Sequence, residues 1–197
     1  GGLFIADEVQ PGFGRTGGGL WGFLRHGLVP DIVTLGKPMG NGYPVAAMVA
    51  RHQVLSDFGT KSRYFNTFGG SSVAMAAASA VLDVIESEGL VENALNTGRL
   101  LQEGLSNLAS RHPMISDVRG AGLFIGAEIT RETKGRLEPA GAEAAAIVNG
   151  LRERGVLISA SGPGSNVLKI RPPLPFGRAE TELFLTLFDD TLRHCSP

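Results

Sequence analysis

The sequence predicts an α/β fold followed by a smaller α+β section. Two apolar runs, within residues 1–10 and 30–41, are short, rich in branched side chains and bounded by Gly or Pro. This pattern is typical of buried strands in an α/β sheet. With 197 residues, 43% of them hydrophobic and 19% charged, the chain can form one large domain or two small ones.

The section up to about residue 70 alternates short apolar runs with loops. Residues 10–19 read QPGFGRTGGG, and Gly and Pro at this density stop both helix and strand. Residues 43–50 read YPVAAMVA, which predicts a third strand.

Two helical patterns come next. Residues 71–88 are Ala-rich, which favours a helix, and Ser71 or Ser72 is a candidate cap. Residues 90–110 show apolar side chains at helical spacing. The apolar positions of this second pattern are Leu90, Ala94, Leu101, Leu105 and Leu108.

The pattern changes after Pro113, and we expect a domain boundary there. Residues 1–111 would form the C-terminal part of a large domain with a connecting helix, and residues 112–197 a small α+β domain. The expected elements of the small domain are strands broken by a Gly turn (115–129), a helix that Gly155 ends (140–154), two short strands (156–160 and 167–171) and a closing helix (178–194).

Composition excludes several classes of partner. The net charge is −1 and the pI about 6.5, so neither nucleic acid nor an anionic membrane is an expected partner. The four histidines show no metal spacing, and we expect no metal site. The single Cys195 fits a reducing, cytoplasmic location. Because Gly1 stands two residues before a strand interior, we expect an N-terminal half to be missing.

A carboxylate and a lysine each follow one of the first two apolar runs. Asp7 ends LFIAD and Lys37 follows IVTLG, and ligands of α/β sheets bind beyond the carboxyl ends of strands. An acid beside a protonated pyridine nitrogen and a lysine that forms an imine are what a pyridoxal phosphate enzyme needs. Taken singly, Asp7 could be a satisfied loop acid and Lys37 an exposed loop lysine. The glycines around Lys37 favour the functional interpretation, because a flat ligand needs room.

Two further residues are candidates for binding anions. Thr67 lies in YFNTFGGSS, just before a predicted helix start, where hydroxyl and N–H groups bind phosphate. Helix capping by serine is the alternative explanation of that pattern. Arg171 follows a short strand in LKIRPPLPF, and its guanidinium suits a carboxylate or a phosphate. A surface ion pair is the alternative for Arg171.

These residues occur together in four long motifs, ADEVQPGFGRTG, PDIVTLGKPMGNGYPVAA, FNTFGGSS and DVRGAGLFIG. With them the sequence resembles the class III aminotransferases, a fold-type I family that uses pyridoxal phosphate. The resemblance covers essentially the whole chain, as the C-terminal half of a family member. It implies the C-terminal part of the fold-type I large domain plus a small α+β domain.

The resemblance implies a role for each candidate at the pyridoxal 5'-phosphate site. Asp7 would pair with the pyridine nitrogen, Val9 would pack on a ring face, and Gln10 would hydrogen-bond on the side of the ring hydroxyl. Lys37 would form the aldimine and then shuttle a proton. Thr67 would contact the phosphate bound by the other subunit of a homodimer with shared active sites.

The activity implied is transfer of an amino group between an amino acid or amine and a keto acid. Arg171 resembles the family's substrate-carboxylate arginine. A phospho-lyase acting on a phosphorylated amine is the alternative, because FNTFGGS and VLISASGPGSNVLKIRPPLPF look closer to the ethanolamine-phosphate phospho-lyase and alanine–glyoxylate aminotransferase 2-like branch. A non-catalytic module that retains the fold is a third possibility. A family member also has an upstream half with most of the phosphate cup, so we expect this chain alone to be inactive.

Overall fold

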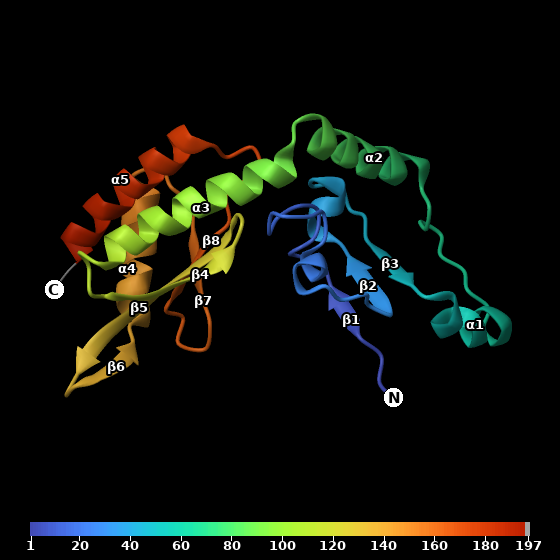
Figure 1. Ribbon diagram of the computed structural model, residues 1–197, viewed down its shortest axis with the longest axis horizontal. Helices are drawn as coiled ribbons and strands as arrows, with labels where there is room; N and C mark the ends of the chain where they lie inside the picture. Colours follow the sequence, from blue (N-terminus) through green and yellow to red (C-terminus); the bar gives the residue numbers. More distant parts are fainter. Residues whose placement is uncertain (196–197) are drawn as a thin grey trace. The chain divides into compact units, whose positions relative to one another are not determined.

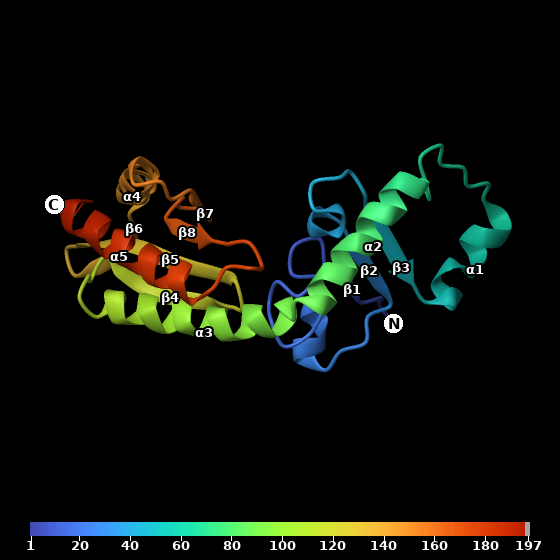
Figure 2. The ribbon, with the colours of Figure 1, turned by 90° about the horizontal axis from the view of Figure 1, so that it is seen from above.

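A computed structural model describes residues 1–195, and it contains the mixture of helices and strands that the sequence predicts (Figures 1 and 2). Contacts divide the chain into two compact units, Gly1–Val91 and Glu92–Pro197. This division falls at the start of helix α3 (Leu90–Ala109), whereas the predicted small domain begins after that helix, at residue 112. No helix within the described part of the chain has the length and apolar character needed to cross a membrane.

The first unit is built on a three-stranded sheet with the order β1-β2-β3. Strand β1 (Ile5–Asp7) pairs in parallel with β2 (Ile32–Leu35), and β2 pairs antiparallel with β3 (Ala47–Ala50). All three strands lie within predicted strand segments. The parallel pairing places the carboxyl ends of β1 and β2 at the same edge of the sheet.

The strands of this sheet are less buried than the sequence predicts. Ala6 and Leu35 are buried, but Ile5, Met48 and Val49 are more than half exposed. The prediction of a buried strand is therefore wrong for Ile5, whereas for residues 43–50 the sequence predicted only a strand. The physical reason is that the apolar side chains face outward where no described residue packs on them.

Among the described residues, two 3₁₀ helices and two α-helices follow or connect the strands of the first unit. The 3₁₀ helices η1 (Gly22–His26) and η2 (Lys37–Gly40) follow the predicted Gly-rich loop and β2. Helix α1 (His52–Lys61), which the sequence did not predict, has no buried residue. Helix α2 (Ser72–Ser87) forms as predicted and packs against η2.

The predicted capping of α2 by a serine side chain is wrong. Ser71 occupies the N-cap position, but its side chain makes no capping hydrogen bond. Its backbone carbonyl accepts the N–H of Met75 at 2.9 Å instead. The start of the helix is therefore stabilised by backbone hydrogen bonds and by the high helix propensity of the Ala residues that follow.

The second unit is an antiparallel sheet with the order β4-β5-β8-β7. It comprises β4 (Ile115–Ala121), β5 (Phe124–Thr133), β8 (Val167–Ile170) and β7 (Ser159–Ser161). Strand β7 begins three residues later than the predicted run at 156–160. An unpredicted strand, β6 (Arg136–Pro139), pairs with the far end of β5 and forms a hairpin with it.

Three helices cover one face of this second sheet: α3, α4 (Gly141–Glu153) and α5 (Arg178–Cys195). Alternate residues of β5 point to the helices, so one face of the sheet packs into the core and no helix of the described chain covers the other face. All five apolar positions predicted for residues 90–110 are buried. The largest fully buried side chains of this core are Leu101, Leu105, Ile125, Ile129, Ile147, Leu151, Leu168, Phe188 and Leu192.

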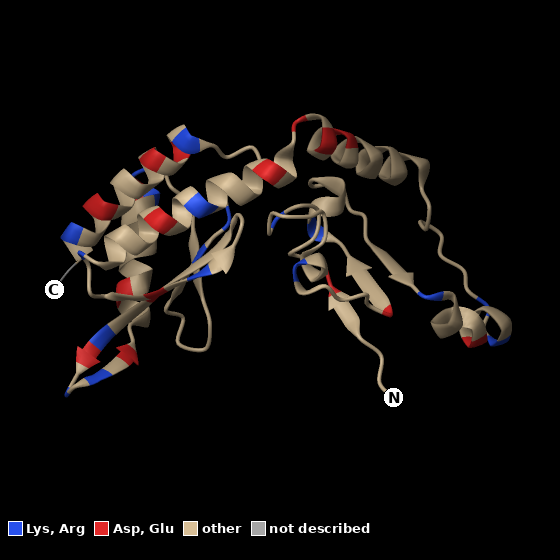
Figure 3. Ribbon diagram, viewed as in Figure 1, with Lys and Arg blue, Asp and Glu red and all other residues tan. Residues whose placement is uncertain are grey.

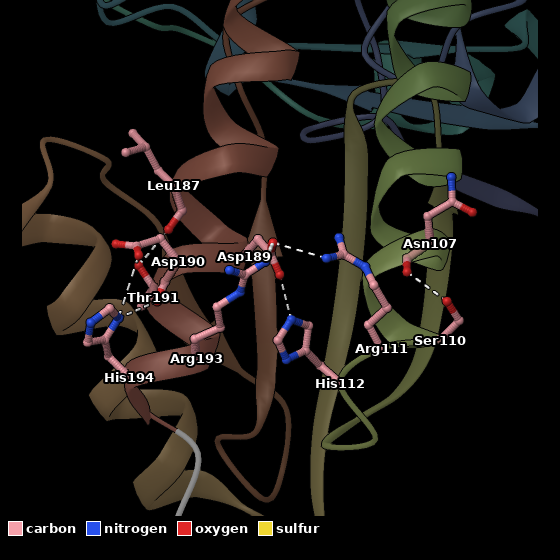
Figure 4. Close-up of polar contacts among 10 residues, drawn as sticks. All are labelled: Asn107, Ser110, Arg111, His112, Leu187, Asp189, Asp190, Thr191, Arg193 and His194. Carbon is pink, nitrogen blue, oxygen red and sulfur yellow. Dashed lines mark hydrogen bonds and ion pairs between the residues drawn. The ribbon is translucent and has the colours of Figure 1, made fainter.

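A polar cluster links the end of α3 to α5 (Figure 4). Asp189 accepts a hydrogen bond from Nε2 of His112 at 2.6 Å and forms ion pairs with Arg111 at 3.1 Å and Arg193 at 2.6 Å. The hydrogen bond from His112, followed by Arg111 and Arg193, holds the pKa of Asp189 below its ordinary value. Elsewhere in this unit, acidic and basic residues are interspersed along the helices and strands (Figure 3).

Candidate functional site

The ends of two adjoining strands bring Asp7 and Lys37 to the same edge of the first sheet. The register pairs Asp7, the last residue of β1, with Thr34 of β2, and Lys37 begins η2 shortly after β2 ends. The N–H of Glu8 donates to the carbonyl of Thr34 at 2.9 Å, which ties the two strand ends together. An open α/β sheet binds its ligand at this kind of edge.

The Asp7 carboxylate is held by one of its two oxygens. Oδ1 accepts the N–H of Val9 at 3.1 Å and the hydroxyl of Thr34 at 3.3 Å. Within residues 1–195, Oδ2 accepts no hydrogen bond, and the side chain is exposed. The strand end therefore presents one oriented carboxylate oxygen to a ligand that carries a donor.

Lys37 is the first residue of η2, and its side chain is exposed. Among the described residues its ammonium group forms neither a hydrogen bond nor an ion pair. The N–H of Met39 donates to the carbonyl of Gly36 at 2.7 Å, which closes the turn that carries the lysine. Asn41 adopts a left-handed conformation with φ 45° and ends η2.

The glycines around Lys37 differ in what a Cβ atom would meet, and only at Gly40 would it clash with the chain. A Cβ on Gly36 would lie 3.4 Å from Val9 Cγ1, and one on Gly40 would lie 2.6 Å from Val45 Cγ1. The sequence interpretation, in which these glycines admit a flat ligand, is therefore wrong for Gly40. Val9 packs over Gly36 and so places an apolar surface beside the turn that carries Lys37. Gln10 begins the following loop and is half-buried.

Glu8 is one residue at this site that sequence reasoning missed. Its side chain is only 2% exposed, and its carboxylate accepts the N–H of Gly22 at 2.7 Å and the N–H of Phe23 at 2.8 Å. Two charge-assisted hydrogen bonds thus close the Gly-rich loop that starts at Gln10. The available signal was an acid inside an apolar run, followed by a loop whose N–H groups need acceptors.

Thr67 lies in the exposed segment 62–70 that precedes α2. Three large side chains of this segment are open to solvent, Tyr64 at 71%, Phe65 at 86% and Phe68 at 84% exposed. Oδ1 of Asn66 accepts the N–H of Phe68 at 3.1 Å, which forms a local turn around Thr67. The Thr67 hydroxyl makes no hydrogen bond with any residue from 1 to 195, so the structure does not join it to Asp7 or Lys37.

Arg171 belongs to the second unit and follows β8. Ile170 is buried and lies in register with Ile125, whereas Arg171 is exposed. Its guanidinium has no ion pair with the described residues, in contrast to Arg119, which pairs with Asp117 and Glu128. The surface ion pair that was the alternative explanation of Arg171 is therefore not observed.

The side chains of the first unit offer anchors for an organic ligand. Asp7 supplies an acceptor, Val9 an apolar face and Lys37 an amine that no described side chain engages. Across residues 1–195, no group of three or more His, Cys, Asp or Glu side chains is placed to hold a metal ion.

The chain matches known proteins along nearly its whole length. Residues 1–192 match the family model described as aminotransferase class-III. The chain is 47% identical, over 96% of its length, to alanine–glyoxylate aminotransferase 2 homolog 2, mitochondrial, of Arabidopsis thaliana. It is 43% identical, over 98% of its length, to ethanolamine-phosphate phospho-lyase homolog 1 of Caenorhabditis elegans. These matches cover 39% and 42% of the two relatives, so the chain spans less than half of their length.

Solved structures agree with the sequence matches. A phospholyase from Arthrobacter in complex with phosphoethanolamine aligns with a TM-score of 0.93 at 45% identity, covering 98% of this chain and 45% of that one. An aminotransferase from Bacillus anthracis aligns with a TM-score of 0.90 at 33% identity, covering 98% and 45%. The predicted fold class and resemblance are confirmed: the chain belongs to the class-III aminotransferase family.

Proposed function

We propose that the protein carrying this chain is a pyridoxal-phosphate-dependent aminotransferase, which moves an amino group between an amino acid or amine and a keto acid. The observation that carries the proposal is the placement of Asp7 at the end of β1 and of Lys37 just after the end of β2, since these two strands are parallel neighbours. Family membership supports it, because the relatives include proteins named as aminotransferases.

The residues present fit pyridoxal phosphate. Bound there, the cofactor would supply an electron sink for the charge that develops on the substrate. Asp7 Oδ2 is the free acceptor that a protonated ring nitrogen needs, and its negative charge favours that protonated form. Val9 would cover one face and exclude water from it. Lys37 would bind the cofactor through Nζ and then take and return a proton at that nitrogen.

The proposal includes a homodimer with shared active sites. The Thr67 hydroxyl has no hydrogen-bond partner in the described part of this chain, which suits a group that serves the phosphate in a neighbouring subunit. The exposed aromatic side chains of the same segment, Tyr64, Phe65 and Phe68, are apolar surface of the kind that a stable interface covers. Sedimentation of the active protein as a monomer would refute this part of the proposal.

Arg171 is the proposed anchor for an anionic substrate group, because its guanidinium is exposed and free of ion pairs with the described residues. A second candidate function, elimination of phosphate from a phosphorylated amine, is favoured by the likeness to a phospholyase in complex with phosphoethanolamine. Arg171 suits either function, since guanidinium groups bind carboxylate and phosphate alike.

The test is an amine-donor assay on the full-length protein. Amino acids, simple amines and phosphorylated amines are each supplied with a keto acid, and both the amino acid product and free phosphate are measured. Amino acid formation without phosphate release supports the aminotransferase. Phosphate release that does not need the keto acid would favour the phospho-lyase over the aminotransferase. If no donor gives either product, the result would favour the non-catalytic module.

A further inference from the structure

Thr34 lies beside Asp7 on the neighbouring strand, and its side chain contacts the Asp7 carboxylate. The register pairs the two residues, and the Thr34 hydroxyl donates a hydrogen bond of 3.3 Å to Oδ1. Nothing in the sequence alone singles out Thr34, because it reads as one more β-branched residue of a strand. Its contact depends on the alignment of two strands that are far apart in the chain.

The hydrogen bond from Thr34 complements the one from Val9. The Val9 N–H follows Asp7 in the same segment, whereas Thr34 approaches from β2, so Oδ1 is tied to both strand ends. Two donors on one oxygen restrict rotation of the carboxylate and leave Oδ2 directed away from them. A carboxylate that is oriented before its ligand arrives loses less conformational freedom on binding.

The Thr34 hydroxyl has no other described task. The backbone carbonyl of Thr34 accepts the Glu8 N–H, and this bond does not involve the side chain. The side chain is half-buried. Valine has the same branching at Cβ and an equal preference for strands, so Thr34→Val removes the hydroxyl and keeps the strand.

We propose that Thr34 is a positioning residue, which holds the Asp7 carboxylate so that Oδ2 meets the protonated ring nitrogen of pyridoxal phosphate. The inference rests on the proposed function, because it takes Asp7 to be the partner of that nitrogen. Thr34 acts only through Asp7 and does not touch the cofactor itself. Serine at this position would retain the effect, since it keeps the hydroxyl.

The experiment compares the wild-type full-length protein with Thr34→Val, Thr34→Ser and the control Thr133→Val. Thr133 lies on β5 in the second unit, is also half-buried, and its hydroxyl bonds to no described residue. The measurements are the dissociation constant of pyridoxal phosphate from fluorescence titration of the apoprotein, the pH dependence of the holoprotein's absorption spectrum, and the melting temperature of the apoprotein.

We expect Thr34→Val to weaken pyridoxal phosphate binding about threefold to tenfold, as the loss of one hydrogen bond does. In the same variant, the spectral change that reports deprotonation of the ring nitrogen should have its midpoint at lower pH. The reason is that a less well-placed carboxylate favours the protonated ring less. Thr34→Ser and Thr133→Val should bind like the wild type, and the melting temperature of the apoprotein should not change.

Wild-type affinity and an unshifted spectrum in Thr34→Val would overturn the inference while leaving the proposed function intact. A loss of equal size in Thr34→Ser or Thr133→Val would also overturn it, because the hydroxyl at position 34 would then not be the cause. A lower melting temperature with an unshifted spectrum would assign Thr34 a purely structural role. Failure of the wild-type protein to bind pyridoxal phosphate would overturn the proposed function together with the inference.

Discussion

Replacing Glu8 by glutamine should loosen the loop that begins at Gln10. In the native chain both carboxylate oxygens accept backbone N–H groups, from Gly22 at 2.7 Å and from Phe23 at 2.8 Å. A glutamine amide offers only one oxygen, so its NH₂ group would face one of these two N–H donors. Water cannot replace the lost acceptor, because the Glu8 side chain is 2% exposed.

The magnitude follows from the bond that is lost. A hydrogen bond to a charged group contributes about 1.5–3 kcal/mol, and leaving a buried donor unpaired adds a penalty, so we expect a local cost of about 2–4 kcal/mol. At about 1.4 kcal/mol for each factor of ten, this cost corresponds to roughly 30-fold to 700-fold more frequent opening of the loop.

Amide hydrogen exchange measures this opening directly in the full-length protein. Peptides covering residues 10–25 should exchange faster in Glu8→Gln, while peptides from the second unit should not change. The matched control is Glu86→Gln, an exposed glutamate of α2 with no ion pair in the described chain. Unchanged exchange over residues 10–25, or an equal effect in the control, would refute the role of Glu8 as the acceptor that closes the loop.

Three further changes test other parts of the account. Asp7→Asn should retain the fold, checked by circular dichroism, but lose most turnover, since a neutral amide favours a protonated ring less; near-normal turnover would count against Asp7. Arg171→Ala should raise KM for an anionic substrate roughly tenfold to a hundredfold without weakening cofactor binding, whereas a lower melting temperature with unchanged KM would show a structural role. Asp189→Asn should lower the melting temperature at pH 7, and the difference from wild type should vanish on acidification: the folded pKa of Asp189 is depressed, so its stabilisation is present above the ordinary carboxyl pKa and is lost as pH falls through the folded value. A difference that persists in strong acid would contradict that linkage.

The elements that the sequence predicted best are those with long, regular patterns. Helix α3 follows from five apolar positions at helical spacing, all of them buried. Helix α1 was missed because its ten residues, HQVLSDFGTK, include a glycine and only three large apolar side chains, Val54, Leu55 and Phe58, none of which is buried. Strand β6 was missed because its residues, RLEP, are all exposed and are held only by pairing with β5.

The sequence predicted which residues belong to the candidate site, but it predicted only part of how they are arranged in space. Asp7 and Lys37 could be predicted because each follows an apolar run, and parallel strands place such ends side by side. Glu8 and Thr34 could not, because their partners lie 14 or more residues away along the chain and are met only through the fold. Gly40 was misinterpreted because the space that it leaves is taken by Val45.

We expect Lys37 to be the amine that binds pyridoxal phosphate. The direct measurement is borohydride reduction of the full-length protein loaded with the cofactor, followed by digestion and peptide mapping. Lys37 should be the single labelled site, and a Lys37→Ala variant treated in the same way should carry no label. Label on Lys61 or Lys169, or label that persists in the variant, would contradict it.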